Sequence, residues 1–218
     1  MKAPLKWLKK YVDIDVDVKS FSDAMTMSGT KVEGYEEVGE DISNVVIGKI
    51  TSITPHPDAD KLIITKIDTG SSEVQIVTGA KNVSVGDIIP VALHGSTLPG
   101  GIKIKKGKLR GEVSEGMLCS AKELGIDEKY VVIESRDGIL LLRGEYTLGD
   151  DVRNALLLND YIVEFELTSN RPDCQSIIGL AHEVSATLDK DVKLPESDFR
   201  EIDKAIEYEV KVLDKDLC

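Results

Sequence analysis

Three histidines are the first candidates for chemistry in this chain of 218 residues. In the run His56-Pro57-Asp58-Ala59-Asp60, an imidazole and two carboxylates lie close enough in sequence to ligate a metal ion. The alternative is a proline-braced turn in which the aspartates accept hydrogen bonds from neighbouring backbone N–H groups. No second ligand-rich segment accompanies the run, so the sequence favours the turn over a metal site.

The remaining histidines and nucleophiles do not complete a catalytic set. His182 lies beside Glu183 on the polar face of an expected helix, which is typical of a solvated surface residue. Ser120 has no histidine placed to activate it, and we expect Cys119 to be a small buried residue. The glycine-rich run 95–101 lacks the Gly-Lys-Ser/Thr ending of a phosphate loop and is better interpreted as a β-hairpin or a barrel corner. We therefore expect no catalytic residue and no metal ligand.

A different chemistry is indicated by the basic segment, defined here as residues 102–111 (Ile-Lys-Ile-Lys-Lys-Gly-Lys-Leu-Arg-Gly). Its alternation predicts a strand with Lys103 and Lys105 on one face and Ile102 and Ile104 facing the core. Five cations this close together can reach several phosphates of a nucleic acid at once. Lysines also protect exposed edge strands from aggregation, and the segment alone leaves both interpretations open. The candidate RNA-binding residues are Lys81, Asn82, Lys103, Lys105, Lys106, Lys108 and Arg110.

The charge distribution narrows the class of partner. A formal net charge of −12 argues against a general nucleic-acid binder, because a polyphosphate is repelled at long range. Residues 79–111 nevertheless carry six Lys or Arg against one acid, so this stretch is +5 and the remainder is −17. Only Tyr130 and Tyr146 are aromatic between residues 40 and 151, which leaves few platforms for base stacking. These features favour contact with the backbone or shape of a folded RNA.

The composition is that of an ordinary globular protein, with 41% hydrophobic and 30% charged residues. No run of about 18 apolar residues could span a membrane, and the opening residues show no export signal. Cys119, Cys174 and Cys218 form neither a CxxC pair nor a zinc-ligand spacing, which indicates a reduced, cytoplasmic protein.

The elements that would position these residues begin with two small helices. The first is expected over residues 4–12, and the second is expected to start at a capping box at 20–23 and to stop at Gly29. β-branched runs separated by Gly, Asn, Ser and Asp then predict a small curled barrel. Its expected strands are 45–53, 62–67, 74–77 and 88–93.

A mixed α/β pattern follows the predicted barrel. A short helix capped by Asp150 or Asp151 should run through Leu158, and a half-buried strand should follow at 161–167. Apolar residues at helical spacing then predict a helix over 177–188. Residues 207–212 alternate like a strand with nothing after them to pair it, which we interpret as the start of a further domain.

Ordered motifs across the predicted barrel resemble a known module. They are His56-Pro-Asp-Ala-Asp-Lys-Leu62, Gln75-Ile-Val-Thr-Gly-Ala-Lys-Asn82, Leu98-Pro-Gly-Gly101, Lys108-Leu-Arg-Gly111 and Ser114-Glu-Gly-Met-Leu-Cys-Ser-Ala-Lys-Glu-Leu-Gly125. Together they resemble the tRNA-binding OB-type barrel attached to several aminoacyl-tRNA synthetases and their cofactors. The flanking motifs resemble the beta chain of bacterial phenylalanine–tRNA ligase; they are Pro4-Leu-Lys-Trp-Leu8, Phe165-Glu-Leu-Thr-Ser-Asn-Arg-Pro-Asp-Cys174 and Ile178-Gly-Leu-Ala181.

The resemblance implies an α+β fold in which a five-stranded OB-type β-barrel is inserted into a small discontinuous helical domain. The implied boundaries are 1–39 for the first half of that domain and 40–151 for the tRNA-binding barrel. Residues 152–195 would complete the discontinuous domain, and 196–218 would begin the editing region. Thr78 stands where many relatives carry Cys, a small-for-small change that leaves barrel packing intact.

The same resemblance implies a function in which this chain is not itself catalytic. The family's ligase attaches phenylalanine to its tRNA with ATP and magnesium, as an α2β2 assembly whose alpha chain holds the synthetic site. Its editing and magnesium-binding residues lie downstream of this stretch, so we expect no cofactor here and no activity from this chain alone. The implied partners are tRNA and the alpha chain, with no DNA and no membrane.

Three alternatives remain at this point. The chain could be a free-standing tRNA-binding chaperone, although the block 170–173 and the strand-like terminus argue against this. It could be a DNA-binding regulator, but helix 176–188 carries no Arg or Lys to meet phosphate. The barrel could also be mainly structural, docking against the rest of a ligase.

Overall fold

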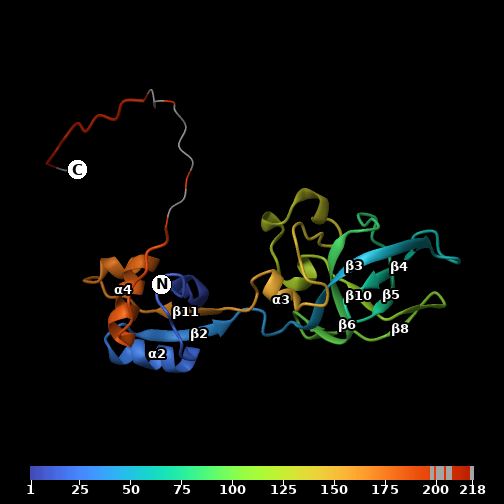
Figure 1. Ribbon diagram of the computed structural model, residues 1–218, viewed down its shortest axis with the longest axis horizontal. Helices are drawn as coiled ribbons and strands as arrows, with labels where there is room; N and C mark the ends of the chain where they lie inside the picture. Colours follow the sequence, from blue (N-terminus) through green and yellow to red (C-terminus); the bar gives the residue numbers. More distant parts are fainter. Residues whose placement is uncertain (197–198, 200–203, 205–207, 217–218) are drawn as a thin grey trace.

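The computed structural model describes residues 1–196, 199, 204 and 208–216. Its fold is α+β and mostly β, and Figure 1 shows its elements in two groups joined by two chain segments. The first group comprises β1 (Lys2–Pro4), α1 (Leu5–Leu8), α2 (Val18–Met27), β2 (Val32–Glu37), β11 (Tyr161–Phe165), η4 (Pro172–Gln175) and α4 (Ile177–Leu188). The second comprises β3 (Ser43–Pro55), β4 (Ile63–Asp68), β5 (Glu73–Thr78), β6 (Ile88–Leu98), β7 (Ile102–Lys103), β8 (Gly107–Leu109), β9 (Glu112–Ser114), β10 (Gly116–Leu118), η1 (Lys122–Leu124), η2 (Glu128–Tyr130), η3 (Ile133–Ser135) and α3 (Val152–Ala155).

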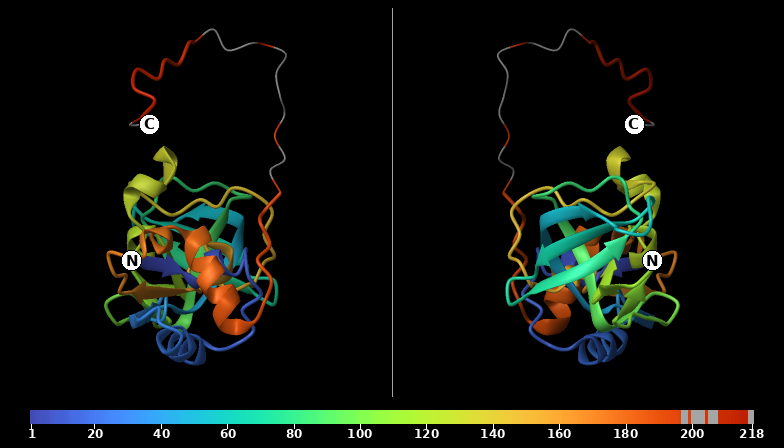
Figure 2. Two further views of the ribbon diagram at one scale, coloured as in Figure 1. Left: turned by 90° about the vertical axis from the view of Figure 1, so that its left-hand side faces the viewer. Right: turned by 90° about the vertical axis from the view of Figure 1, so that its right-hand side faces the viewer.

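The first group is an antiparallel sheet, in the order β1-β11-β2, with helices packed against it. Figure 2 (left) shows α4 in front of this group and α2 below it. Phe21 of α2 meets Phe165 of β11 edge to face, with ring centroids 6.5 Å apart and an interplanar angle of 87°. Both rings are fully buried. The segments before and after the second group therefore share one hydrophobic cluster, which neither could build alone.

The helices of the first group start and stop at positions that only partly match the sequence-based expectation. α2 begins at Val18, because the Asp17 carboxylate accepts hydrogen bonds from the N–H groups of Lys19 and Ser20, each at 3.0 Å. The predicted capping box at 20–23 is therefore wrong. α1 is only four residues long, but the predicted bounds of α4 are confirmed, with Ser176 as its N-cap.

The second group is built on a sheet in the order β10-β6-β3-β4-β5, with β7 added to β6. The four strands predicted from β-branched runs are confirmed, and β3 and β6 are longer than expected. β3 pairs with β6 along its first half and with β4 along its second. A Cβ at Gly48 would lie 2.6 Å from Ile67 Cγ2 and 2.8 Å from Val91 Cγ2. Glycine is therefore needed where β3 passes between its neighbours.

The two ends of this sheet approach one another without pairing as strands within residues 43–118, all of which the structure describes. The Glu115 N–H, just before β10, donates to the Gln75 carbonyl of β5 at 2.8 Å. The Val77 N–H of β5 donates to Ser114 Oγ at 3.2 Å. The sheet is therefore curled, and these single bonds, rather than a strand ladder, join its ends.

Both faces of the curled sheet are buried, which explains why β3 is apolar at successive positions. Val45 and Ile47 pack into a cluster with residues of the segment after β10, such as Leu140. Ile50 belongs to a second cluster, which includes Ile67 of β4. The segment after β10 contributes to both clusters, with Leu140 in the first and Ile139 and Leu141 in the second, so it helps to bury both faces of the sheet.

The chain after α4 contains no strand among its described residues. Residues 208–212 of the predicted strand 207–212 are not a strand in the structure, and Glu207 lies outside the described residues. No helix in the part of the chain that the structure describes is long and apolar enough to cross a membrane.

Candidate nucleic-acid interface

The basic segment is a bent arm, and the single strand predicted for it is wrong. β6 turns through Gly100 and Gly101, at φ 79° and 76°, into the two-residue strand β7. After a break, β8 pairs with β9 around Arg110 and Gly111. Ile104 is buried as expected, but Ile102 is 54% exposed. The N–H and C=O of Ile104 still bond the chain at residues 95–96, but the segment leaves β6 after this point, so the predicted strand does not continue.

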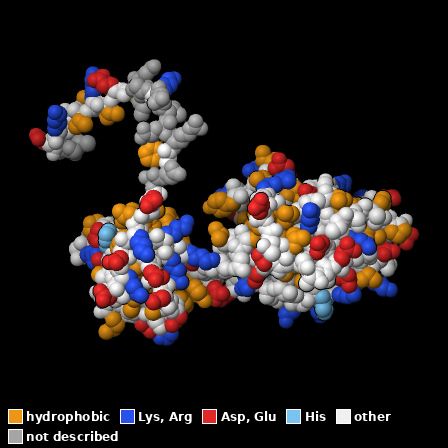
Figure 3. Space-filling model, viewed as in Figure 1, with side chains coloured by type: hydrophobic (Ala, Val, Ile, Leu, Met, Phe, Trp, Pro, Cys, Tyr) orange, Lys and Arg blue, Asp and Glu red, His pale blue; other side chains and the backbone are white. Residues whose placement is uncertain are grey.

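The cations of the arm are presented to solvent. The exposed cations of the arm are Lys103, Lys105, Lys106, Lys108 and Arg110, and Lys81, which follows β5, is exposed as well. Lys106 forms an ion pair with Glu115, and its hydrogen bond is the main cause that lowers the pKa of that carboxyl. Among the described residues, no ion pair involves the other five. Figure 3 shows Lys and Arg side chains along the edge below β6 and β8. The arrangement leaves most of the positive charge available to an anionic partner.

Asn82, another candidate residue, is occupied within the chain. Its amide nitrogen donates to the carbonyls of Glu134 and Ile139, at 3.0 and 2.9 Å. Its amide oxygen accepts from the Ile139 N–H at 3.0 Å. The Asn82 amide therefore joins the loop after β5 to the segment after β10 and has no further proton to offer a phosphate.

A groove of about 490 Å³ lies beside the arm. It is bordered by Leu109 of the basic segment and by Gly79 and Ala80 after β5. Two further exposed cations, Lys122 and Arg136, line it together with the acids Glu123 and Asp137. Sequence reasoning missed these two cations because each is isolated along the chain. Only the fold brings them to the same groove as the basic segment.

His56 forms a turn, as the sequence favoured, but by a different bond. The residue is 5% exposed, and its Nδ1 accepts a hydrogen bond from the Asp58 N–H at 3.1 Å. Its Nε2 lies 3.2 Å from the Leu109 carbonyl oxygen in the basic segment. The ring, rather than an aspartate side chain, therefore holds the turn, and both of its nitrogens are used.

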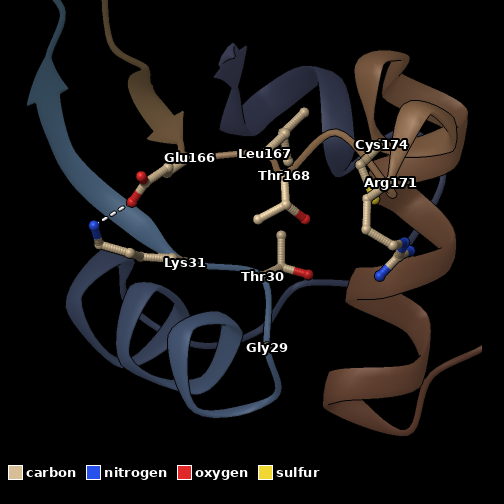
Figure 4. Close-up of a pocket in the computed structure, with 8 residues that line it drawn as sticks. All are labelled: Gly29, Thr30, Lys31, Glu166, Leu167, Thr168, Arg171 and Cys174. Carbon is tan, nitrogen blue, oxygen red and sulfur yellow. Dashed lines mark hydrogen bonds and ion pairs between the residues drawn. The ribbon is translucent and has the colours of Figure 1, made fainter.

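A second pocket, of about 170 Å³, lies in the first group between α2, β11 and η4 (Figure 4). The Arg171 guanidinium at its edge donates to both carboxylates of Asp173 and Glu183, with N–O distances of 2.7 and 2.6 Å. The hydrogen bonds from Arg171 lower the pKa of Asp173 to about 2. Lys31 and Glu166 form a further ion pair across the pocket mouth.

This pocket includes part of the one cluster of possible metal ligands among the described residues, formed by Asp173, Cys174 and Glu183. The Arg171 guanidinium already forms ion pairs with both carboxylates. Burial raises the pKa of the Cys174 thiol to about 11, so the thiol is protonated at neutral pH. The cluster is therefore a salt-bridged junction that fixes η4 against α4.

Comparison with known proteins places these features in a family. Residues 45–144, which contain the basic segment and the groove, match the family model described as "Putative tRNA binding domain". Over the whole chain, the phenylalanine–tRNA ligase beta subunit of Clostridium acetobutylicum is 51% identical. Over its whole length, the chain therefore matches part of a phenylalanine–tRNA ligase beta subunit. The beta subunits of Clostridium tetani and Syntrophus aciditrophicus are 47% and 44% identical, also over 100% of this chain.

The chain spans 27% of the length of each of these three beta subunits. Among solved structures, a MetRS-related protein from Pyrococcus horikoshii is 22% identical and covers 48% of this chain and 84% of its own, with a TM-score of 0.34. The C-terminal domain of Plasmodium vivax p43 is 23% identical and covers 38% of this chain and 48% of its own, with a TM-score of 0.30. TM-scores this low do not indicate a shared overall fold.

Proposed function

We propose that this stretch of a phenylalanine–tRNA ligase beta subunit binds the backbone of tRNA through its basic segment and is not itself catalytic. The observation that carries the proposal is the arm's exposed charge. Lys103, Lys105, Lys108 and Arg110 are exposed without an ion-pair partner among the described residues, within the region that the tRNA-binding family model matches. Cations free of internal partners can neutralise phosphates without first breaking an existing bond.

An OB-type arrangement of the second group supports this role. In chain order, β3, β4, β5, β6 and β10 would be the five strands of such a barrel. OB folds bind nucleic acids with the loops between strands 1 and 2 and between strands 4 and 5. Here those loops are residues 56–62 and 99–115, and the second contains the basic segment. Because the basic segment lies in the loop that corresponds to a nucleic-acid-binding loop of OB folds, we propose that the five-stranded barrel is the functional unit.

We also propose the domain division that the sequence indicated. Residues 1–39 and 152–195 would form one discontinuous domain around the inserted unit 40–151, and 196–218 would lead into a further domain. The separate hydrophobic clusters support two units, but Val152 of α3 packs in the cluster of the second group, so the clusters place the end of the inserted unit beyond residue 151. In the complete ligase, which we place in the cytoplasm, an alpha chain in an α2β2 assembly would carry out phenylalanine attachment with ATP and magnesium.

The test is a titration of the chain with tRNA across salt concentrations, comparing wild type with K103E/K105E. If about three phosphates are neutralised, the slope of log K against log salt should be about −2 to −3, with a loss of roughly 20- to 40-fold between about 50 and 200 mM salt. The double variant should bind more weakly and with a shallower slope. Its thermal stability should stay close to wild type, because both side chains are exposed.

The matched control is K9E/K10E. It changes the net charge by the same amount at two adjacent exposed lysines of the first group. An effect of overall charge alone would weaken binding equally in both double variants and would contradict the proposal. Equal affinity and slope in wild type and K103E/K105E would instead favour the structural alternative, in which the barrel docks against the rest of the ligase.

A further inference from the structure

Two of the three histidines hold the backbone of the basic segment. His94 lies in β6, and His56 directly follows β3. Each ring bonds the main chain of the segment at a different point, Lys106 in one case and Leu109 in the other. These two points enclose Lys108 and lie next to Lys105 and Arg110, so they span the densest cationic part of the arm.

The His94 contact fixes the start of this part. Its Nδ1 accepts a hydrogen bond from the Lys106 N–H at 3.0 Å. The carbonyl of His94 accepts in turn from the side-chain amide of Asn44, near the start of β3, at 3.1 Å. The Lys106 backbone lies outside β7 and β8, so no ladder hydrogen bond holds it there. The His94 ring supplies the bond that a strand partner would otherwise make.

The His56 contact fixes the basic segment at Leu109, the last residue of β8. A carbonyl oxygen can only accept, so the Nε2 of His56 must carry the proton that it shares with Leu109. The acceptor role of Nδ1 towards the Asp58 N–H requires the same tautomer. The 56–62 turn is thereby joined to the basic segment, and the ring that joins them is almost fully buried.

We propose that His56 and His94 are positioning residues that hold the cations of the basic segment in the arrangement in which they meet phosphates. The inference rests on the proposed function and adds to it the residues that order the binding surface. An unanchored arm would have to be ordered when RNA binds, and that ordering lowers the affinity. Neither histidine needs to touch the RNA.

The experiment compares two pairs of variants in the 218-residue chain by tRNA titration across salt. H56A and H94A should each weaken binding about three- to ten-fold, the range expected for ordering one more flexible group on binding. The salt slope should stay that of wild type, because no cation has been removed. H56Q keeps a side-chain donor towards the Leu109 carbonyl, and H94N keeps an acceptor towards the Lys106 N–H. Both should restore most of the affinity.

Amide hydrogen exchange provides a readout independent of RNA. The Lys106 amide should exchange faster in H94A than in wild type and should be protected again in H94N. H182A is the matched control, because His182 is an exposed histidine on α4 in the first group. It should change neither binding nor Lys106 exchange. If H56A loses thermal stability through its buried site, the exposed His94 pair decides the question.

Several outcomes would overturn the inference. Wild-type affinity in both alanine variants would show that the anchors are irrelevant, and a shallower slope in H94A would show that His94 contacts phosphate itself. Failure of both conservative variants to restore binding would also count against it. A different result would contradict the proposed tRNA-binding function alone. In that case K103E/K105E would bind tRNA like wild type, while the Lys106 amide would still exchange faster in H94A.

Discussion

The Arg171 side chain shows how a single charged group joins separate parts of the first group. It binds Asp173 in η4 and Glu183 in α4, and Glu183 also accepts a hydrogen bond from Thr30 Oγ1 at 3.2 Å. The guanidinium thus joins two consecutive elements, and Glu183 connects them to Thr30, which is distant in sequence. Planar, bidentate geometry of this kind is what distinguishes arginine from lysine at such a junction.

The Asp173 pair gives a prediction of pH dependence. The hydrogen bonds from Arg171 lower the pKa of Asp173 from 3.8 to about 2 in the folded chain. Its stabilising contribution is therefore present above about pH 4 and is lost as the pH falls towards 2. D173N should have a lower free energy of unfolding than wild type at pH 6, and the difference should shrink towards pH 2.

Urea unfolding at a series of pH values measures this difference. The control is D137N, since Asp137 is exposed and takes part in no ion pair among the described residues. A constant D173N difference from pH 6 to pH 2 would mean that the pair does not stabilise the fold.

The roles of individual polar residues were harder to predict than their surroundings. The run at His56 was recognisable as a turn from Pro57 and its aspartates. The imidazole's second bond depends on Leu109, 53 positions later. Asn82 likewise resembled a binding residue beside Lys81, but its partners lie at Glu134 and Ile139. Sequence spacing carries no signal for contacts of this range.

At the level of elements, local patterns predicted what local forces decide. The strands of the second sheet follow from β-branched runs, and α4 follows from its apolar face and the Ser176 cap. β1 was not predicted, because its three residues are a strand only through pairing with β11. The basic segment alternated like a strand, yet its residues 104–106 lie outside both of its strands.

Gly48 provides a test of how closely the second sheet is packed. In G48A, the new methyl group would meet Ile67 Cγ2 and Val91 Cγ2 at 2.6 and 2.8 Å, shorter than van der Waals contact. We expect a loss of about 1–3 kcal/mol in the free energy of unfolding, measured by urea denaturation.

The control for this change is G34A. Gly34 also lies in a strand, β2, but a Cβ there would meet nothing within 4 Å. It should change stability far less than G48A. Equal effects of the two substitutions would show that strand propensity, and not the close approach at Gly48, determines the result.

At the scale of the whole molecule, each group carries a local concentration of charge of one sign. A depression in the first group is lined by the acids Glu36, Glu37, Glu40 and Asp41, whereas the basic segment lies in the second. An anionic partner should therefore be attracted by the basic segment and repelled by the acidic depression. This separation would orient a bound RNA and discourage contacts elsewhere.

The separate hydrophobic clusters predict that the two groups lose stability independently. F21A removes a fully buried ring that packs against Phe165 and should destabilise the first group by about 3–5 kcal/mol. Native-state hydrogen exchange should then show faster exchange in β11 and β2, while the amides of β3, β4 and β6 keep their wild-type protection.

The reciprocal variant makes this last prediction decisive. I50A removes buried apolar volume inside the curled sheet and should destabilise the second group by about 2–5 kcal/mol. Its faster-exchanging amides should lie in β3, β4 and β6, and those of β11 should be spared. Because the second group is inserted between the two halves of the first, cooperative unfolding would instead raise exchange in both groups with either substitution. That pattern would refute the proposed domain division, and opposite patterns in F21A and I50A would support it.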